Sequence, residues 1–210
     1  MKNFLWEAIK RGTLKKNTNY PTIGVLGLQG DFQEHIEILT KLQIPYIKVT
    51  SSEDLDKING LIIPGGESTT IIKLLKTNNI FKKLKKKIQL GLPTWGTCAG
   101  AIVLAKKVTG LKLETLKILE IDVARNAYGR QKESFSADVS IPKLNKNRFP
   151  GIFIRAPKIN KISSKIKPIA KLKNGEIVGI EEKNIIVTTF HPELTQDDSL
   201  HKYFLKKISH

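Results

Sequence analysis

Short apolar runs alternate with amphipathic segments in the first half of the chain. The runs at residues 22–28, 45–49, 60–64 and 92–95 are bounded by glycine, proline or polar residues, which predicts buried strands. Between them, residues 31–43 carry apolar side chains at helical spacing, with Asp31 as the expected N-cap. The sequence predicts a short helix or turn at residues 51–58, two short helices at residues 68–89 and a further helix at residues 98–107. This alternation predicts parallel strands joined by right-handed crossovers, which form a doubly wound α/β sheet.

The second half of the chain is mostly strand-like. Strands are expected at residues 117–125, 134–141, 151–156, 167–173, 176–183 and 184–190. Asn174 and Gly175 lie between two of them and predict a tight hairpin, so antiparallel pairing should be enriched here. A last helix is expected at 196–208. There is no internal repeat and no dividing linker, so residues 22–210 are expected to form one domain.

The first 21 residues are expected to form an N-terminal extension outside this domain. Their apolar patch at residues 4–9 is too short and interrupted for a secretory signal, but it could form an amphipathic turn before Gly12. A loosely ordered arm, a docking arm and an organelle-targeting segment all remain open.

Composition narrows the class of protein. The chain has 210 residues, 40% of them hydrophobic, but no run near the roughly 20 apolar residues of a membrane span, so no membrane partner is expected. The single cysteine excludes an intramolecular disulfide framework and a Cys-rich metal site, and it favours a cytoplasmic setting. The net charge of +17 would suit nucleic acid, phosphate-rich ligands or an acidic protein face. Lysine-rich segments without interleaved aromatic residues disfavour specific nucleic-acid binding.

Cys98 lies in the segment GTCAG, directly between an apolar strand and an apolar helix. A nucleophile flanked by small residues at a strand-to-helix turn is the pattern of a nucleophile elbow. The start of the following helix carries partial positive charge, which favours a thiolate. The alternative is a small buried hydrophobic residue, which is the usual role of a lone cysteine.

His191 and Glu193 follow the last predicted strand in the segment FHPE. Residues two apart on an extended segment point to the same side, so the Glu193 carboxylate can orient the His191 imidazole. With Cys98 at the end of another strand, they predict a Cys-His-acid triad in the crevice at the carboxyl ends of the strands. A histidine that merely caps a strand is the alternative.

A glycine-rich loop, PGGES at residues 64–68, follows a third predicted strand. Paired glycines let backbone N–H groups converge on a negative atom, as an oxyanion hole requires, and Glu67 could bind a cationic amine. An ordinary loop capped by Ser68 into the next helix is the alternative. The spacing of a phosphate-binding loop is absent, and no cofactor or metal site is expected.

In their order and spacing, PGGEST, GTCAG and FHPEL resemble the class I (triad) glutamine amidotransferases. The segments IGVLGLQGDFQEH, RNAYGRQKESF and FIRAP narrow this to a resemblance with the glutaminase subunits of pyridoxal 5′-phosphate synthase, over about residues 22–208. The resemblance implies a flavodoxin-like fold. It implies hydrolysis of L-glutamine to glutamate and ammonia through a thioester, and transfer of the ammonia to a (β/α)8-barrel synthase subunit in a hetero-oligomer.

The same resemblance implies a role for each matching residue. Cys98 would be the nucleophile, His191 the base and acid, and Glu193 the group that orients His191. The N–H groups of Gly66 and Ala99 would form the oxyanion hole. The residues expected around the glutamine are Gly65, Gly66, Glu67, Arg125, Ile154 and Arg155.

Some positions keep a second interpretation. Arg155 could instead be a structural ion-pair residue. Gln29 and His35 could lie at a synthase interface, or be a polar strand end and a histidine on a helix surface. The chain departs from the family at Leu116 and Lys117, where a Leu-Gly step is common, and in the short stretch 107–117.

Overall fold

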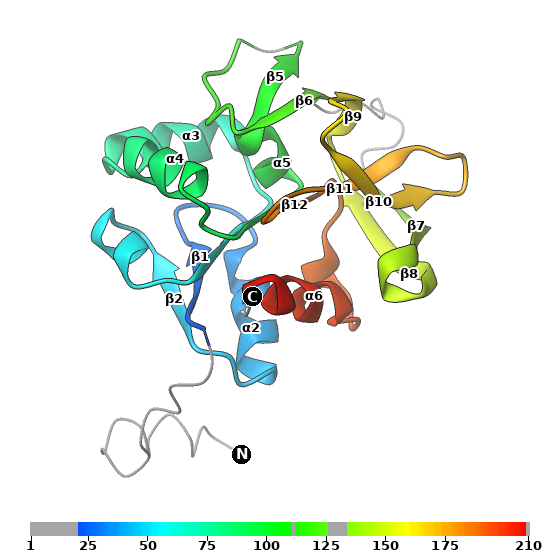
Figure 1. Cartoon of the computed structure of the whole chain (residues 1–210), viewed down its shortest axis with the longest axis horizontal. Coiled ribbons are helices and arrows are strands. Elements are labelled where there is room, and N and C mark those ends of the chain that lie inside the picture. The colour runs from blue at the N-terminus through cyan, green and yellow to red at the C-terminus, as the bar shows by residue number, and fades with distance from the viewer. Residues whose placement is uncertain (1–20, 111, 126–133, 209–210) are drawn as a thin grey trace.

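The computed structural model describes residues 21–110, 112–125 and 134–208. A nine-stranded sheet runs through it in the order β2-β1-β3-β4-β12-β11-β10-β7-β8, and β5, β6 and β9 form a second, three-stranded sheet (Figure 1). The strands from β2 to β12 in that order are parallel, and those from β12 to β8 pair antiparallel. This confirms the expected doubly wound α/β sheet with antiparallel strands in the second half.

The first half of the chain builds the parallel part of the large sheet. Its elements are β1 (Ile23–Leu26), α2 (Phe32–Lys41), β2 (Tyr46–Val49), η1 (Glu53–Asp56), β3 (Gly60–Ile63), α3 (Ser68–Thr77), α4 (Phe81–Gln89), β4 (Thr94–Thr97) and α5 (Ala99–Leu104). Both helices expected in residues 68–89 are present, with the break where Asn78 and Asn79 stand.

The second half supplies the antiparallel strands and the last helix. Its elements are β5 (Ala105–Thr109), β6 (Leu119–Ala124), β7 (Ser134–Ile141), η3 (Pro142–Leu144), β8 (Lys146–Ile154), β9 (Lys158–Ile162), β10 (Lys167–Leu172), β11 (Ile177–Glu182), β12 (Ile185–Thr188), η4 (Pro192–Leu194) and α6 (Ser199–Ile208). The expected hairpin joins β10 to β11, where Gly175 has a φ of 85°. Strand β8 starts earlier than the expected segment 151–156.

The parallel strands are buried on both faces, which explains their continuous apolar sequence. Leu61 and Ile63 of β3 pack with α3, α4 and α5, whereas Ile62 points to the opposite face, with α2 and α6. Figure 1 shows α2 and α6 together on one side of the sheet and α3 and α4 on the other. Because β1, β3, β4 and β12 run parallel between these two helical layers, their carboxyl ends lie at one edge of the sheet.

The helix expected over residues 98–107 is wrong in its last three residues, 105–107. Helix α5 ends at Leu104, and Ala105–Thr109 is strand β5, which pairs parallel with β6. A continuous apolar run fits a helix or a buried strand equally well, and only pairing decides. Here Leu116 N–H donates to Val103 O and Ile118 N–H to Leu104 O, which ties the following segment to the end of the helix.

Strand β9 was not expected. Its sequence is typical of a lysine-rich surface segment, and no strand was predicted there. Ile159 is the one buried residue of β9, and the strand pairs antiparallel with β6. A short strand with one buried side chain has little periodicity to read.

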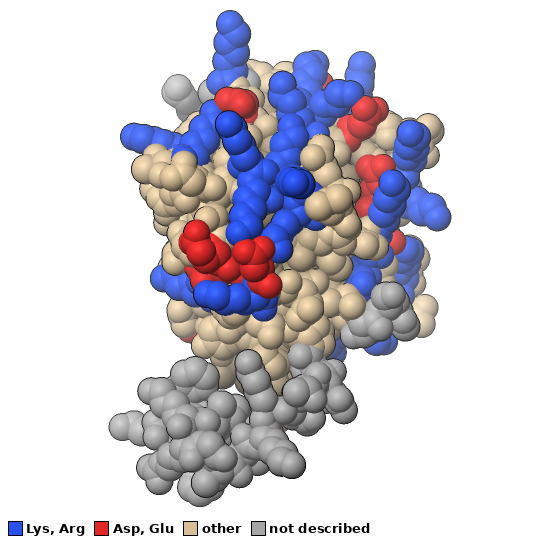
Figure 2. Space-filling view, turned by 60° about the vertical axis from the view of Figure 1, so that its left-hand side comes forward, with Lys and Arg blue, Asp and Glu red and all other residues tan. Residues whose placement is uncertain are grey.

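Lysines cover much of the surface. Figure 2 shows Lys and Arg side chains spread over one face, with acidic side chains among them. On α4, Lys83 and Lys87 pair with Asp56. The expected N-terminal extension lies almost wholly outside the described residues. None of the helices in the described ranges is long and apolar enough to cross a membrane.

Candidate active site

The functional side chains expected from the sequence meet where parallel strands end. Cys98 directly follows β4, and His191 follows β12, the neighbour of β4 in the sheet. The glycine-rich loop follows β3, on the other side of β4. Because parallel strands share one carboxyl edge, residues far apart in sequence come together there.

Cys98 occupies a strained turn. It has φ 45° and ψ −103°, a backbone conformation that residues with a side chain rarely adopt. Its N–H donates to Thr188 O at 2.8 Å, which ties the turn to β12, and its Sγ lies 3.8 Å from Ile154 O. This is the geometry of a nucleophile elbow.

Gly100 lets α5 approach β3 at this elbow. A Cβ on Gly100 would lie 2.2 Å from Ile63 O, a backbone atom that cannot swing aside. We expect Gly100→Ala to lower the free energy of unfolding by about 1–3 kcal/mol or more, through overpacking. Urea unfolding followed by circular dichroism measures this effect.

Gly27→Ala is the matched control, since the three atoms nearest the new Cβ there all belong to the flexible Lys48 side chain. Equal stability of the two variants would contradict the tight contact between α5 and β3.

His191 and Glu193 interact as the sequence predicts. His191 Nδ1 lies 2.7 Å from Glu193 Oε1, and both side chains are buried. Burial alone would lower the pKa of His191, but hydrogen bonds to Cys98 and Glu193 outweigh burial and raise it to about 11. Because Nδ1 is engaged with Glu193, Nε2 is the ring nitrogen left for the thiol.

The Asp31 carboxylate, which the sequence predicted only as a helix cap, approaches the same nitrogen. Asp31 Oδ2 lies 3.3 Å from His191 Nδ1. Asp31 stands at the N-cap position of α2, as expected, but its side chain makes no capping hydrogen bond. Asp31, His191 and Glu193 bring possible metal-ligand atoms within 4.8 Å of one another, but His191 Nδ1 is already engaged with Glu193.

A pocket of about 300 Å³ opens beside Cys98 and His191. Every residue expected around the glutamine borders it except Gly65, and Ala99 borders it as well. The pocket is lined by Gln29, Gly30, Asp31, Gly66, Glu67, Ser68, Cys98, Ala99, Ile102, Arg125, Ile154, Arg155, Pro157 and His191. Gly65 packs instead against the His191 ring, since a Cβ there would lie 2.3 Å from His191 Cε1.

Two of the three charged residues expected around the substrate, Glu67 and Arg125, form an ion pair with each other. Arg125 Nη2 lies 2.7 Å from both Oε1 and Oε2 of Glu67. Glu67 also caps α3 by accepting from the Thr69 N–H, the position that the ordinary-loop interpretation gave to Ser68. The rest of the RNAYGRQ motif lies outside the described residues.

Gln29 and His35 have structural partners inside this chain. Gln29 Oε1 accepts from the Glu67 N–H at 2.7 Å, which fixes the glycine-rich loop. His35 is fully buried, so both interpretations offered for it, a helix-surface histidine and an interface residue, are wrong. Its position on a helix gave no sequence signal of the site behind it.

The family model for the SNO glutamine amidotransferase family matches residues 25–210. The chain belongs to the SNO glutamine amidotransferase family. This confirms the resemblance found in the motifs and makes the chain an enzyme of the amidotransferase class.

Curated relatives and solved structures agree with this family. Pyridoxal 5′-phosphate synthase subunit PdxT of Thermotoga neapolitana is 49% identical over 186 residues, which covers 89% of this chain and 98% of the relative. The PdxT subunit of Dehalococcoides mccartyi is 46% identical, over 88% of this chain and 95% of the relative. A crystal structure of a glutamine amidotransferase superposes with a TM-score of 0.84 at 43% identity, over 90% of this chain and 99% of that one.

A more distant crystal structure shows the fold alone. It is that of a protein from Thermoplasma acidophilum named as part of a GMP synthase, with a TM-score of 0.65 at 18% identity, over 90% of this chain and 94% of that one.

Proposed function

We propose that this chain is the glutaminase subunit of a pyridoxal 5′-phosphate synthase and that Cys98, His191 and Glu193 carry its chemistry. The single observation that carries the proposal is the meeting of these three residues at one pocket. The cysteine stands on a strained elbow, and its imidazole partner is held by a carboxylate at 2.7 Å. The names of the curated relatives supply the pathway.

The first half of the reaction is acyl transfer. His191 Nε2 takes the thiol proton, and the Cys98 sulfur attacks the side-chain amide carbon of L-glutamine. The N–H groups of Gly66 and Ala99, assigned by family resemblance, donate to the oxyanion, each worth about 2.7–4 kcal/mol in related acyl transfers. His191 then protonates the leaving nitrogen, so ammonia departs and a γ-glutamyl thioester remains on Cys98.

The second half is hydrolysis of the thioester. His191 Nε2 removes a proton from water as the oxygen attacks the thioester carbon, and the sulfur departs as a thiolate. Glutamate leaves, and the pair of Cys98 thiolate and His191 imidazolium is restored, as the raised pKa of His191 requires. Burial raises the pKa of Glu193, and the hydrogen bond and charge of His191 oppose that shift; as a carboxylate, Glu193 accepts from His191 Nδ1 and keeps the proton there.

Glu67 and Arg125 recognise the two charges of the amino-acid substrate. Their mutual ion pair supports this role, because each side chain already has an opposite charge within reach at the pocket. In the complex, the α-ammonium group of glutamine pairs with Glu67 and its α-carboxylate with Arg125. Glutamine therefore replaces one ion pair with two.

Substitution of Arg125 tests this recognition. We expect Arg125→Met to raise the KM for glutamine about 10- to 100-fold, because a charge-assisted hydrogen bond worth about 1.5–3 kcal/mol is lost, while kcat changes less. Steady-state glutamate release measures both constants.

Arg148→Met is the control, since the Arg148 side chain is 82% exposed on β8 and pairs with Asp138 away from the pocket. An unchanged KM in Arg125→Met would exclude Arg125 from substrate binding.

The partner in this proposal is a (β/α)8-barrel synthase subunit that receives the ammonia. The basic surface would suit an acidic face of that subunit. The cytoplasmic setting and the division into an extension at 1–21 and one domain at 22–210 stay predictions.

An isotope experiment tests the whole function. The chain, mixed with its synthase partner and the sugar phosphate substrates, receives glutamine labelled with ¹⁵N on the side-chain amide. We expect labelled nitrogen in the pyridoxal 5′-phosphate formed and one glutamate per ammonia released. A mixture that forms the complex but releases no glutamate would overturn the proposal.

A further inference from the structure

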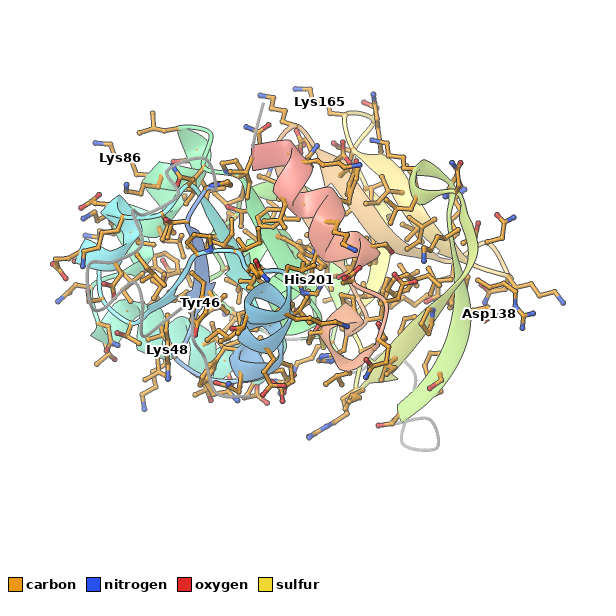
Figure 3. All side chains as sticks on the ribbon, turned by 90° about the horizontal axis from the view of Figure 1, so that it is seen from below. Tyr46, Lys48, Lys86, Asp138, Lys165 and His201 are labelled. Carbon is orange, nitrogen blue, oxygen red and sulfur yellow. The ribbon has the colours of Figure 1, made fainter. Side chains whose placement is uncertain are left out.

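Two buried histidines lie behind the triad, on the side of Glu193 that faces away from His191. His35 is on α2 and His201 on α6, and Figure 3 shows His201 in the interior of the molecule, near α2. His35 Nε2 lies 3.4 Å from Glu193 Oε2, and His35 Nδ1 lies 3.0 Å from His201 Nε2. The triad thus continues, through direct contacts, into the layer between the two helices.

Both of these histidines are neutral. Burial lowers the pKa of His35 well below its ordinary value, and the nearby His201 and His191 lower it further. Burial also lowers the pKa of His201 to about 3. Each ring therefore carries one N–H and one unprotonated nitrogen.

Counting protons leaves two arrangements. The contact between His35 Nδ1 and His201 Nε2 uses one proton. The other lies either on His35 Nε2, facing the Glu193 carboxylate, or on His201 Nδ1, which has no hydrogen-bond partner among the described residues. A buried N–H without an acceptor is costly, and an unprotonated His35 Nε2 would face a carboxylate oxygen with its lone pair.

Thr97 does not reverse this preference. Its Oγ1 lies 3.3 Å from His35 Nε2 and could donate to that nitrogen in the second arrangement. That arrangement would still bury the His201 N–H unpaired, whereas in the first arrangement Thr97 Oγ1 serves as a second acceptor for the His35 N–H. The first arrangement therefore satisfies more groups.

We propose that His35 is a positioning residue for the glutaminase reaction, donating from Nε2 to Glu193 Oε2, and that His201 sets its tautomer by donating from Nε2 to His35 Nδ1. The donors then point one way along the whole series, from His201 through His35 to the carboxylate. This inference rests on the proposed function, because it assumes that Glu193 orients His191.

A hydrogen bond from His35 to Glu193 Oε2 fixes the rotation of the carboxylate, and this determines the direction in which Oε1 points. No donor in the described part of the chain makes a standard hydrogen bond with Glu193 Oε2, and His35 Nε2 is the nitrogen that approaches it. At 3.4 Å the contact is long, as catalytic hydrogen bonds often are before substrate tightens them. If the Glu193 carboxylate were free to rotate, His191 Nδ1 could pair with Asp31 instead, because Asp31 Oδ2 lies 3.3 Å from that nitrogen.

Two substitutions at His35 separate positioning from packing. In His35→Gln the amide nitrogen occupies the place of Nε2 and keeps a donor to Glu193, whereas in His35→Asn it occupies the place of Nδ1 and loses that donor. With the synthase present, we expect His35→Asn to lower kcat about 10- to 100-fold with KM for glutamine within about twofold. His35→Gln should keep kcat within about threefold of the parent.

Equal losses in both variants, or none in either, would overturn the proposal. The urea unfolding midpoint and the affinity for the synthase partner are measured for both variants, so that a folding defect is recognised. Should His35→Asn fail to fold, the tautomers decide the question alone.

Nitrogen NMR of the ¹⁵N-histidine-labelled chain reports the tautomers without any activity measurement. The chain has four histidines, and spectra of His35→Gln and His201→Gln assign the two of interest. We expect both to carry the proton on Nε2. A proton on Nδ1 of either ring would overturn the proposal.

The two proposals fail in different ways. Full activity of a Cys98→Ala variant would contradict the proposed function, but it would not contradict the hydrogen bonds that join His201, His35 and Glu193. A Cys98→Ala variant without activity, beside equal His35→Gln and His35→Asn variants, would end only the role of His35.

Discussion

Replacing Cys98 with alanine will abolish glutamate release, with an expected loss of at least about 10,000-fold in kcat. The loss is this large because no other group can form the thioester, and removing the nucleophile of such a triad leaves only binding and oxyanion stabilisation. The measurement is glutamate formed from glutamine by the variant in complex with saturating synthase subunit.

The chain itself supplies the control for this experiment. Cys98 is its only cysteine, so a diazoketone analogue of glutamine, which alkylates an activated thiol, should add one label to the parent chain and none to the variant. Mass spectrometry reads the label. Binding of glutamine by the variant, measured by calorimetry, shows that the pocket survives. Turnover at the parent rate would exclude Cys98 as the nucleophile.

The second large effect is expected from Glu193→Gln, which should lower kcat about 1,000- to 10,000-fold. The amide of glutamine can present an N–H to His191 Nδ1, and this favours the tautomer with its proton on Nε2, which cannot accept the thiol proton. Size and shape are retained, so the loss comes from the proton position. Steady-state kinetics with the synthase subunit measures it.

Glu53→Gln, at an exposed position in η1, makes the same chemical change away from the pocket and should leave kcat unchanged. A Glu193→Gln variant within tenfold of the parent would show that His191 takes its orientation elsewhere, with Asp31 as the nearest carboxylate.

Much of the fold could be predicted because parallel strands buried on both faces have continuous apolar sequences. The segments around Ile23, Ile62 and Val187 have this pattern, and all three side chains are fully buried. Turn chemistry fixed the hairpin at Gly175 in the same way, since its positive φ is a local property of the residue.

Strands β5 and β9 could not be predicted for a common reason. Each belongs to the small sheet, where β6 lies between them, and a pairing partner distant in sequence decides their structure. Val108 in β5 is only half-buried and Ile159 is the one buried residue of β9, so neither strand shows the alternation that identifies a strand by itself.

In the candidate site, too, residues with a local sequence motif could be predicted, and residues defined by contacts distant in sequence could not. Cys98, His191 and Glu193 could be predicted because each stands at a strand end with a distinctive local motif, and parallel strands bring such ends together. His35 and Asp31 could not, because one lies on a helix whose periodicity only marks a buried face and the other resembles an ordinary helix cap. Their roles depend on distances across the sheet edge that no local pattern contains.

The backbone at Cys98 places chemistry and folding in opposition at a single position. A residue with a side chain held at φ 45° and ψ −103° costs on the order of 1–3 kcal/mol, which glycine would not incur. In the proposed reaction, turnover depends on a thiol at a position where the folded chain would be more stable without a side chain. Stability alone would favour glycine on this turn, so the proposed thiol chemistry carries a cost in folding free energy.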